Sequence, residues 1–276
     1  YPLFLDALGL GKISVGPPYF NAVFVPIMTP VLVLVAAGPI ARWKHADLKD
    51  IGRRLAVALV LALVAGAGLP FVYGAWTPLV ALGLLLAVWV AASVVFQIWE
   101  RVRKGAPPRA FWGMQCAHLG VAVFVAGVTI VQGYQEEKDV RMGPGDTVSV
   151  GGYGFRFMDV REVPGPNYTA ARGTVEVSRD GRVLKTLHPE KRSYFSSAMP
   201  MTEAAIDAGL LRDVYVSLGE PLDGGAWAVR VYYKPLVDWI WGGCLLMALG
   251  GLLAASDRRY RLARKAAATP AGAVAA

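Results

Sequence analysis

The sequence has few cysteines and few histidines. Only two cysteines occur in 276 residues, Cys116 and Cys244, and both lie inside long apolar blocks. Two isolated thiols exclude a small fold held together by several disulfides. The haem-attachment pattern C-x-x-C-H is absent, so the chain is not itself a c-type cytochrome. No P-loop and no H-E-x-x-H sequence occurs either, which removes two common signatures of nucleotide and zinc chemistry.

Basic residues avoid the centres of the apolar blocks and collect in three short clusters. The net charge is +8, and the excess lies within residues 42–54, 101–109 and 258–265. If successive blocks cross a membrane in alternating directions, all three clusters fall on one side, which the positive-inside rule assigns to the cytoplasm. The positions of the positive charges therefore indicate how the chain crosses the membrane, and we expect no nucleic-acid partner.

Apolar residues are abundant and occur in long runs. They make up 55% of the chain and form five blocks of about 20 residues, the length of a helix that crosses a lipid bilayer. The sequence predicts a polytopic α-helical membrane protein with spans at 22–41, 51–73, 78–99, 110–132 and 235–256. Residues 1–21, rich in Gly and Pro, are expected to form a loop on the side opposite the cytoplasm, and the basic residues 257–276 a disordered cytoplasmic tail.

Between residues 133 and 234 the pattern changes from long apolar runs to short alternating segments. "TVSVGGYGFRFMDV", "GTVEVSRDGRVLKTL", "VYVSLGEP" and "AWAVRVYYK" alternate apolar and polar residues, and Asp180-Gly181 is a typical hairpin turn. "MTEAAIDAGL" is expected to be a short helix that begins with Thr202 as its cap. We therefore predict a small β-barrel or sandwich, inserted between the last two spans on the side opposite the cytoplasm.

His118 is the most informative single residue. It is the only Asp, Glu, Lys, Arg or His between Arg109 and Glu136, so it falls within the fourth span. An ionisable residue at membrane depth is costly and marks a functional site by default. On a helical wheel it shares a face with Gln115, Thr129 and Gln132, opposite three small residues with a spacing of seven, Gly113, Gly120 and Gly127.

Three kinds of partner would satisfy a buried imidazole at this position. They are a hydrogen bond to a neighbouring helix, a haem or metal ion, and a chain of proton-carrying groups. The other spans have no acid or histidine near mid-depth, which disfavours the proton relay. Of the remaining histidines, His45 lies in a basic loop and His188 just before a proline, where solvated loop and turn residues are expected. If His118 binds a haem that is held by two histidines, the second ligand is expected from missing sequence or from another subunit.

Seven segments, in this order, resemble one known family. They are "LGLGKISVGPPYFNAVF", "GMQCAHLGVAVFVAGV", "EEKDVRMGPGD", "GPNYTA", "LHPEKRSYF", "MPMTEAAID" and "LLAASDRRYR". Together they resemble the C-terminal part of CcmF, the membrane haem lyase subunit of the bacterial cytochrome c maturation system. The resemblance covers nearly the whole chain, except for the alanine-rich tail.

The resemblance implies a multi-pass protein of the bacterial inner membrane, with the β domain in the periplasm and the C-terminus in the cytoplasm. Such a protein receives haem from the haem chaperone CcmE and ligates it to the thiols of apocytochrome c together with other maturation subunits. It also implies that haem b lies within the membrane and passes electrons from quinol to the incoming haem. The histidine of the family's "AHLG" segment is an axial ligand of this haem and corresponds to His118.

The chain departs from the family pattern because several expected elements do not occur in it. The tryptophan-rich WWD segment, two external histidines and the second haem b ligand have no counterpart here, so we expect a missing N-terminal portion that supplies them. The chain alone is then part of a haem lyase or quinol–haem oxidoreductase complex. The alternative is a non-catalytic membrane scaffold whose periplasmic β domain docks maturation partners.

Overall fold

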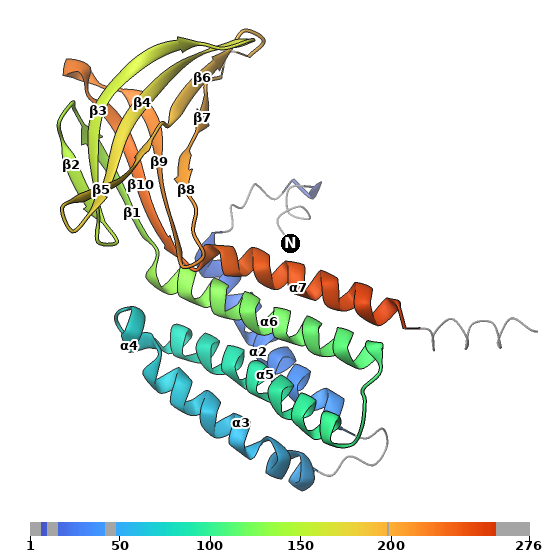
Figure 1. Cartoon of the computed structure of the whole chain (residues 1–276). Coiled ribbons are helices and arrows are strands. Elements are labelled where there is room, and N and C mark those ends of the chain that lie inside the picture. The colour runs from blue at the N-terminus through green and yellow to red at the C-terminus, as the bar shows by residue number, and fades with distance from the viewer. Residues whose placement is uncertain (1–6, 10–15, 42–47, 198, 258–276) are drawn as a thin grey trace, which may run out of the picture. The chain divides into compact units, whose positions relative to one another are not determined.

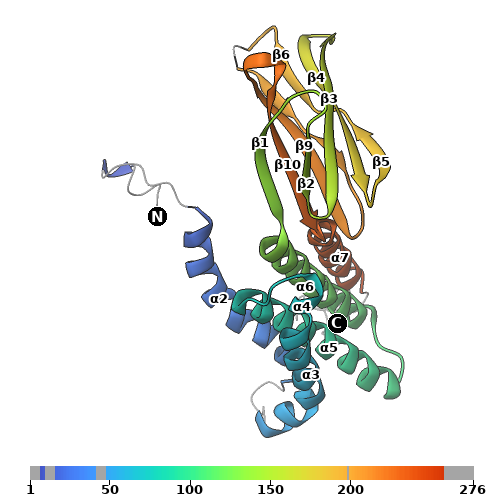
Figure 2. The ribbon, with the colours of Figure 1, turned by 90° about the vertical axis from the view of Figure 1, so that its left-hand side faces the viewer.

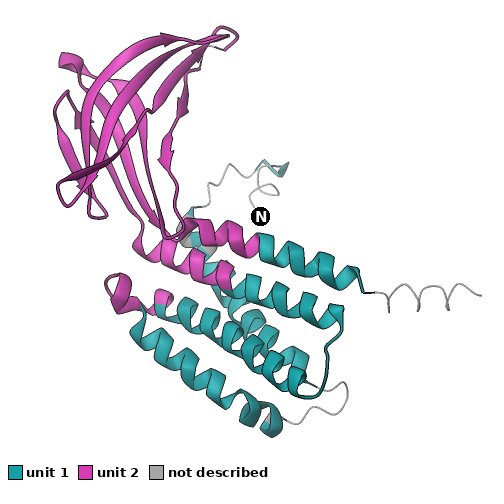
Figure 3. Ribbon diagram, in the orientation of Figure 1, with its two compact units in different colours: residues 1–69, 81–122, 245–276 teal, residues 70–80, 123–244 magenta. Residues whose placement is uncertain are grey.

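The computed structural model describes residues 7–9, 16–41, 48–197 and 199–257. His45, the tail beyond Asp257 and most of the expected N-terminal loop lie outside these ranges. The described chain divides into two compact units (Figure 3). Unit 1 comprises residues 1–69, 81–122 and 245–276, and unit 2 comprises residues 70–80 and 123–244. The two long helices on either side of the β domain contribute residues to both units.

Five helices in the described residues are long and apolar enough to cross a membrane, as the sequence predicts. They are visible as long coils in Figure 1. A short 3-10 helix, η1 (Gly38–Ile40), follows the first of them, and a single turn, α4 (Pro70–Tyr73), follows the second. The five long helices are α2 (Pro17–Ala37), α3 (Leu48–Gly68), α5 (Pro78–Arg103), α6 (Arg109–Tyr134) and α7 (Val237–Ala255).

The first helix begins earlier than expected, within the stretch that the sequence suggested would be a loop. Gly16 is extended, and Pro17 and Pro18 follow it at the start of α2. Proline is well suited to this position, because the first N–H groups of a helix have no partner within the helix. A count of apolar residues cannot detect such a start. For a related reason α5 and α6 extend to Arg103 and Tyr134, since polar residues can continue a helix beyond its apolar block.

In unit 1 the central helix is α5. In its most apolar 18-residue stretch, 50% of the residues are buried, whereas in the corresponding stretches of α2 and α7 only 11% are buried. Its Trp89 side chain is 9% exposed and lies in an apolar cluster with residues of α2, α3 and α6. The Trp89 indole N–H also donates to the Val33 carbonyl at 3.3 Å. Trp89 therefore packs between helices.

Small residues bring α6 and α7 into close contact. A Cβ atom added to Gly250 would lie 2.5 Å from the Ala117 nitrogen and 2.6 Å from the Gly113 oxygen. Further along the same pair of helices, a Cβ added to Gly127 would lie 2.9 Å from the Ile240 nitrogen. Membrane helices gain most of their association from such backbone approach. The glycine face predicted for the fourth span is thus a helix–helix contact at Gly113 and Gly127.

The β domain, within unit 2, consists of two antiparallel sheets (Figures 1 and 2). One has the order β1-β10-β9-β8, and the other has the order β2-β3-β4-β6-β7 with β5 paired to β4. The strands are β1 (Glu136–Met142), β2 (Thr147–Val150), β3 (Tyr153–Pro164), β4 (Tyr168–Arg179), β5 (Arg182–Leu187), β6 (Glu190–Tyr194), β7 (Met201–Glu203), β8 (Ala205–Asp207), β9 (Arg212–Pro221) and β10 (Trp227–Pro235).

The alternating sequence pattern explains the core of this domain. Every second side chain of β3, β4, β9 and β10 points into one apolar cluster, in which Phe155 and Phe157 are fully buried. Hairpins connect the strands where the sequence places turn residues. Asp180 and Gly181 both have positive φ, at 51° and 75°, as a type I′ turn requires. The predicted β-barrel or sandwich and its Asp180-Gly181 hairpin are therefore confirmed.

The helix expected at residues 201–210 is wrong, because this segment forms β7 and β8. Exposure alternates from Thr202 to Leu210 with a period of two residues, where a helix would give a period near 3.6. Thr202 does not cap a helix, and its hydroxyl donates to the Leu218 carbonyl at 3.3 Å. Ten residues form a marginal helix in isolation, whereas the two strands pair with the open edges of β6 and β9.

The close approach of α6 and α7 generates the first prediction. The substitution Gly250→Ala places a methyl group against the backbone of α6, which cannot move aside cheaply, and we expect a destabilisation of about 1–3 kcal/mol. Gly251→Ala is the matched control, because a Cβ there meets nothing within 4 Å. The measurement is the thermal unfolding midpoint of the purified protein in detergent. Equal midpoints for both variants would contradict the packing.

Candidate functional site

His118 lies on α6 about 13 Å along the helix axis from Arg109. The imidazole is half-buried, between the buried residues Gln115 and Ala122 on neighbouring turns. Within the described ranges, its ring makes no hydrogen bond and no ion pair to any other residue. The bond to a neighbouring helix that would satisfy a purely structural histidine is therefore not made by the described residues.

A chain of buried amides lies one turn away from this histidine, within unit 1. Gln115 is 1% exposed, and its Nε2 donates to Gln97 Oε1 on α5 at 3.1 Å. Gln97 Nε2 in turn donates to the Ala36 carbonyl at 3.3 Å. The last carbonyls of a helix lack partners within that helix. Gln97 thus caps the end of α2 and links α2, α5 and α6.

The amide chain ends in an unpaired atom. Gln115 Oε1 is buried and accepts no hydrogen bond, although burial of an unpaired carbonyl is costly. Side chains three residues apart on a helix are neighbours, and helical side chains lean toward the N-terminus. The imidazole of His118 therefore leans over the turn that carries Gln115. Both polar groups without a protein partner belong to the same stretch of α6.

This arrangement suits the coordination of a haem iron. A haem ligand needs an imidazole whose nitrogen lone pair is not used by the protein, and His118 meets that condition. It also lies one turn from the small residue Ala122, on a helix that packs against α7 through Gly113 and Ala117. The described residues contain no group of three or more His, Cys, Asp or Glu that could hold a bare metal ion.

The other histidines do not join this site. His188 is an exposed residue between β5 and β6, and its Nδ1 lies 3.3 Å from the Gly173 carbonyl. The sequence suggested a turn residue, whereas His188 lies in the short connection between two strands that both pair with β4. His45 falls outside the described residues, so the expectation of a solvated loop histidine there stays a prediction.

Sequence reasoning missed Gln97. Attention to acids, bases and histidines in the spans passes over an uncharged amide, yet Gln97 is 7% exposed and connects three helices. A buried amide in an apolar span is a usable signal, because two donors and an acceptor must all find partners. Asp257 was also missed. Its carboxylate accepts from the Ala110 N–H at 2.9 Å and so caps the N-terminus of α6.

Comparison with known proteins was consistent with these features. The sequence model of the CcmF C-terminal beta-sandwich matches residues 133–235. The cytochrome c-type biogenesis protein CcmF of Pseudomonas aeruginosa is 48% identical over 269 residues, which cover 95% of this chain and 41% of the relative. The protein of the same name from Escherichia coli is 45% identical over 262 residues, covering 94% and 40% respectively.

A membrane helix bundle with an inserted β-sandwich and a half-buried histidine in one spanning helix defines a multi-pass membrane protein with a candidate cofactor site. The chain belongs to the CcmF family and corresponds to the C-terminal part of its members. It spans about two fifths of the length of the curated relatives that it matches. A solved structure named cytochrome c haem lyase CcmF shares the fold, with a TM-score of 0.75 at 24% identity over 87% of this chain and 40% of that one.

The amide chain generates the second prediction. Gln97→Leu removes the acceptor of Gln115 Nε2 and the donor to the Ala36 carbonyl, and each group left unpaired costs about 1–3 kcal/mol. Ser93→Ala is the control, because Ser93 is also buried on α5 but bonds only to Val90 of its own helix. We expect the thermal midpoint in detergent to fall clearly more for Gln97→Leu. Similar midpoints would show that the amide chain contributes little.

Proposed function

We propose that this chain is the C-terminal portion of a membrane cytochrome c haem lyase and that His118 is an axial ligand of haem b. The observation that carries the proposal is the half-buried imidazole within a spanning helix that has no protein partner among the described residues. The names of the relatives support it, since they are cytochrome c-type biogenesis proteins and one solved relative in fold is a haem lyase.

The protein's own contribution at this site is to hold one nitrogen lone pair in an apolar environment. The glycine contact with α7 fixes one face of α6, and the Gln115–Gln97 bond fixes it against α5. The imidazole of His118 is therefore presented from a helix that two neighbours hold in place. A bound haem b would supply one-electron chemistry, which links quinol oxidation to reduction of the haem that is being attached.

The remaining components lie outside this chain. Haem of the b type with two histidine ligands needs a second imidazole, and the N-terminal portion found in longer relatives is its proposed source. We further propose that CcmE delivers the haem, that apocytochrome c receives it, and that the β domain lies in the periplasm with the C-terminus in the cytoplasm. The basic residues at the C-terminal end of α5 and at the start of α6 support this orientation through the positive-inside rule.

The β domain is the proposed docking element for apocytochrome c or other maturation subunits. Large exposed apolar side chains occur in the segment between β6 and β7 and at the start of β7. Phe195 is 74% exposed, Met199 79% and Met201 54%. Exposed Phe and Met side chains are typical of protein interaction surfaces. This docking role is the one that the scaffold alternative assigns to the β domain. Haem binding and partner docking can coexist in one protein.

The ligand role of His118 generates the third prediction. In membranes that contain the complete assembled protein, His118→Ala should abolish the b-type optical spectrum, because the iron loses one axial nitrogen. His188→Ala is the matched control and should retain the spectrum, since His188 is exposed between β5 and β6 of the β domain. Reduced-minus-oxidised absorbance difference spectra provide the measurement.

The same residue separates the two candidate functions. If His118 only packs or hydrogen-bonds between helices, His118→Gln should preserve both the spectrum and cytochrome c maturation, because the amide keeps polar atoms at a similar position. If His118 coordinates iron, the same substitution should remove the b-type signal while the protein still accumulates in the membrane. An intact spectrum in both His118 variants would reject the ligand assignment.

The docking role generates the fourth prediction. Replacement of Phe195 and Met199 by Ser should lower the amount of apocytochrome c that co-purifies with the assembled protein, because the exposed apolar contact is removed. Replacement of Val183 and Leu184 by Ser is the control, since these residues on β5 are 60% and 53% exposed. Equal recovery of apocytochrome c with both double variants would place the contact elsewhere.

A further inference from the structure

Two leucines project from the short loop between β8 and β9, which comprises residues 208–211. Leu210 is 73% exposed and Leu211 is 65% exposed. Loops in water usually present polar residues or glycine, and adjacent exposed leucines in a four-residue connection are unfavourable there. Their position relative to the membrane helix of the same unit explains them.

The loop is bonded to the beginning of the spanning helix α7. The Trp239 indole N–H donates to the Leu210 carbonyl at 3.0 Å, and the Leu236 N–H donates to the Leu211 carbonyl at 3.0 Å. Trp239 lies in the first turn of α7, and Trp241 follows with 68% exposure. Tryptophans at the end of a spanning helix lie at the level of the lipid headgroups. The loop is therefore held at that same depth.

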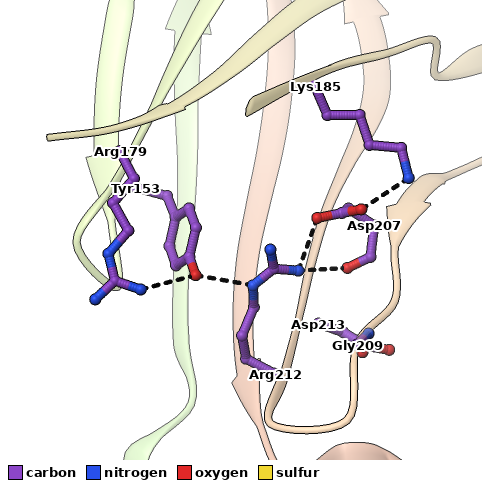
Figure 4. A network of polar contacts seen from close by, with 7 residues as sticks. All are labelled: Tyr153, Arg179, Lys185, Asp207, Gly209, Arg212 and Asp213. Carbon is purple, nitrogen blue, oxygen red and sulfur yellow. Dashed lines mark hydrogen bonds and ion pairs between the residues drawn. The ribbon is translucent and has the colours of Figure 1, made fainter. Parts of the chain in front are cut away.

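The polar groups at both ends of the loop are occupied within the β domain (Figure 4). Arg212 Nη1 donates to the Asp207 carbonyl at 2.9 Å and pairs with its carboxylate at 2.7 Å, and Arg212 Nε donates to the Tyr153 hydroxyl at 2.9 Å. Lys185 holds the same carboxylate at 2.7 Å. Burial raises the pKa of Asp207, but the bonds from Lys185 and Arg212 outweigh it, so the pKa lies below its ordinary value and the network stays ionised.

Part of the loop backbone is bonded in the same way. The Gly209 N–H donates to Asp213 Oδ1 at 3.0 Å, and the Gly209 carbonyl accepts from the Arg212 N–H at 3.2 Å. Together with the bonds from Trp239 and Leu236, these contacts occupy the Gly209 N–H and the carbonyls of three successive residues. Non-helical backbone near lipid needs partners for its polar groups, and the three carbonyls have such partners. The two leucine side chains are the largest exposed apolar groups of the loop.

We propose that residues 208–211 form a lipid-contacting loop, whose Leu210 and Leu211 side chains insert among the acyl chains of the leaflet around the first turn of α7. The partner is the bilayer that α7 itself crosses, so the loop surface continues an existing membrane surface. A docked protein strand is disfavoured, because such a strand needs free carbonyls and those of Gly209, Leu210 and Leu211 already accept hydrogen bonds. The leucines thus anchor the β8–β9 end of the β domain to the membrane, and the polar network fixes the loop to the sheets.

The test uses the full chain in phosphatidylcholine vesicles. Cys116 and Cys244 are replaced by Ala, and a nitroxide spin label is attached to a single new cysteine in Leu210→Cys, Leu211→Cys or Phe195→Cys. Phe195 is the matched control, with 74% exposure on the segment after β6. Electron paramagnetic resonance measures label collisions with oxygen, which concentrates in lipid, and with a water-soluble nickel chelate.

The expected result is a several-fold higher ratio of oxygen to nickel collisions at Leu210 and Leu211 than at Phe195. Two separate label positions guard against a single variant that fails to fold. Equal ratios at all three positions would mean that the loop lies in water and would overturn the proposal. Protection of the two loop labels from both reagents would also overturn it, because that result indicates contact with protein.

Discussion

The close contact between α6 and α7 is the constraint on which the rest of this structure depends. It exists because Gly113, Gly127 and Gly250 have no side chain at points where the two backbones nearly touch. α6 carries the candidate ligand His118 and leads directly into β1, and α7 receives the chain from β10. This glycine-lined contact therefore fixes the helix that bears the imidazole. It also joins the two helices that precede and follow the β domain in the chain.

Polar contacts inside the membrane complete this arrangement, because apolar packing alone gives little orientation among helices in lipid. The Gln115–Gln97 bond and the bond from Gln97 to the end of α2 fix three helices together by two directional contacts. Asp257 fixes the start of α6 in the same manner. The face of α6 that carries His118 is thus set by specific hydrogen bonds on one side and by glycine packing on the other.

Much of the fold could be predicted from the sequence, because the strongest signals are local. Five apolar blocks predicted five spanning helices, and alternation with an Asp-Gly turn predicted the β domain. The segment at 201–210 was misread because its helix-forming residues are outweighed by pairing with β6 and β9, which no local pattern reveals. The start of α2 at Pro17 was missed because the sequence rules favoured a loop in a Gly- and Pro-rich stretch.

Of the two polar residues that define the candidate site, His118 could be predicted from the sequence and Gln97 could not. His118 stands out in sequence because ionisation is costly in lipid, whereas Gln97 carries no charge and becomes visible only when its two bonds are seen. Among the buried polar side chains of the described spanning helices, Ser93 and Gln97 are bonded, and Gln115 retains one unpaired oxygen. That oxygen and the unpartnered imidazole of His118 lie one turn apart on α6. Folding normally satisfies buried polar groups, so the unpaired Gln115 oxygen beside His118 supports the proposal that this turn of α6 faces a bound group.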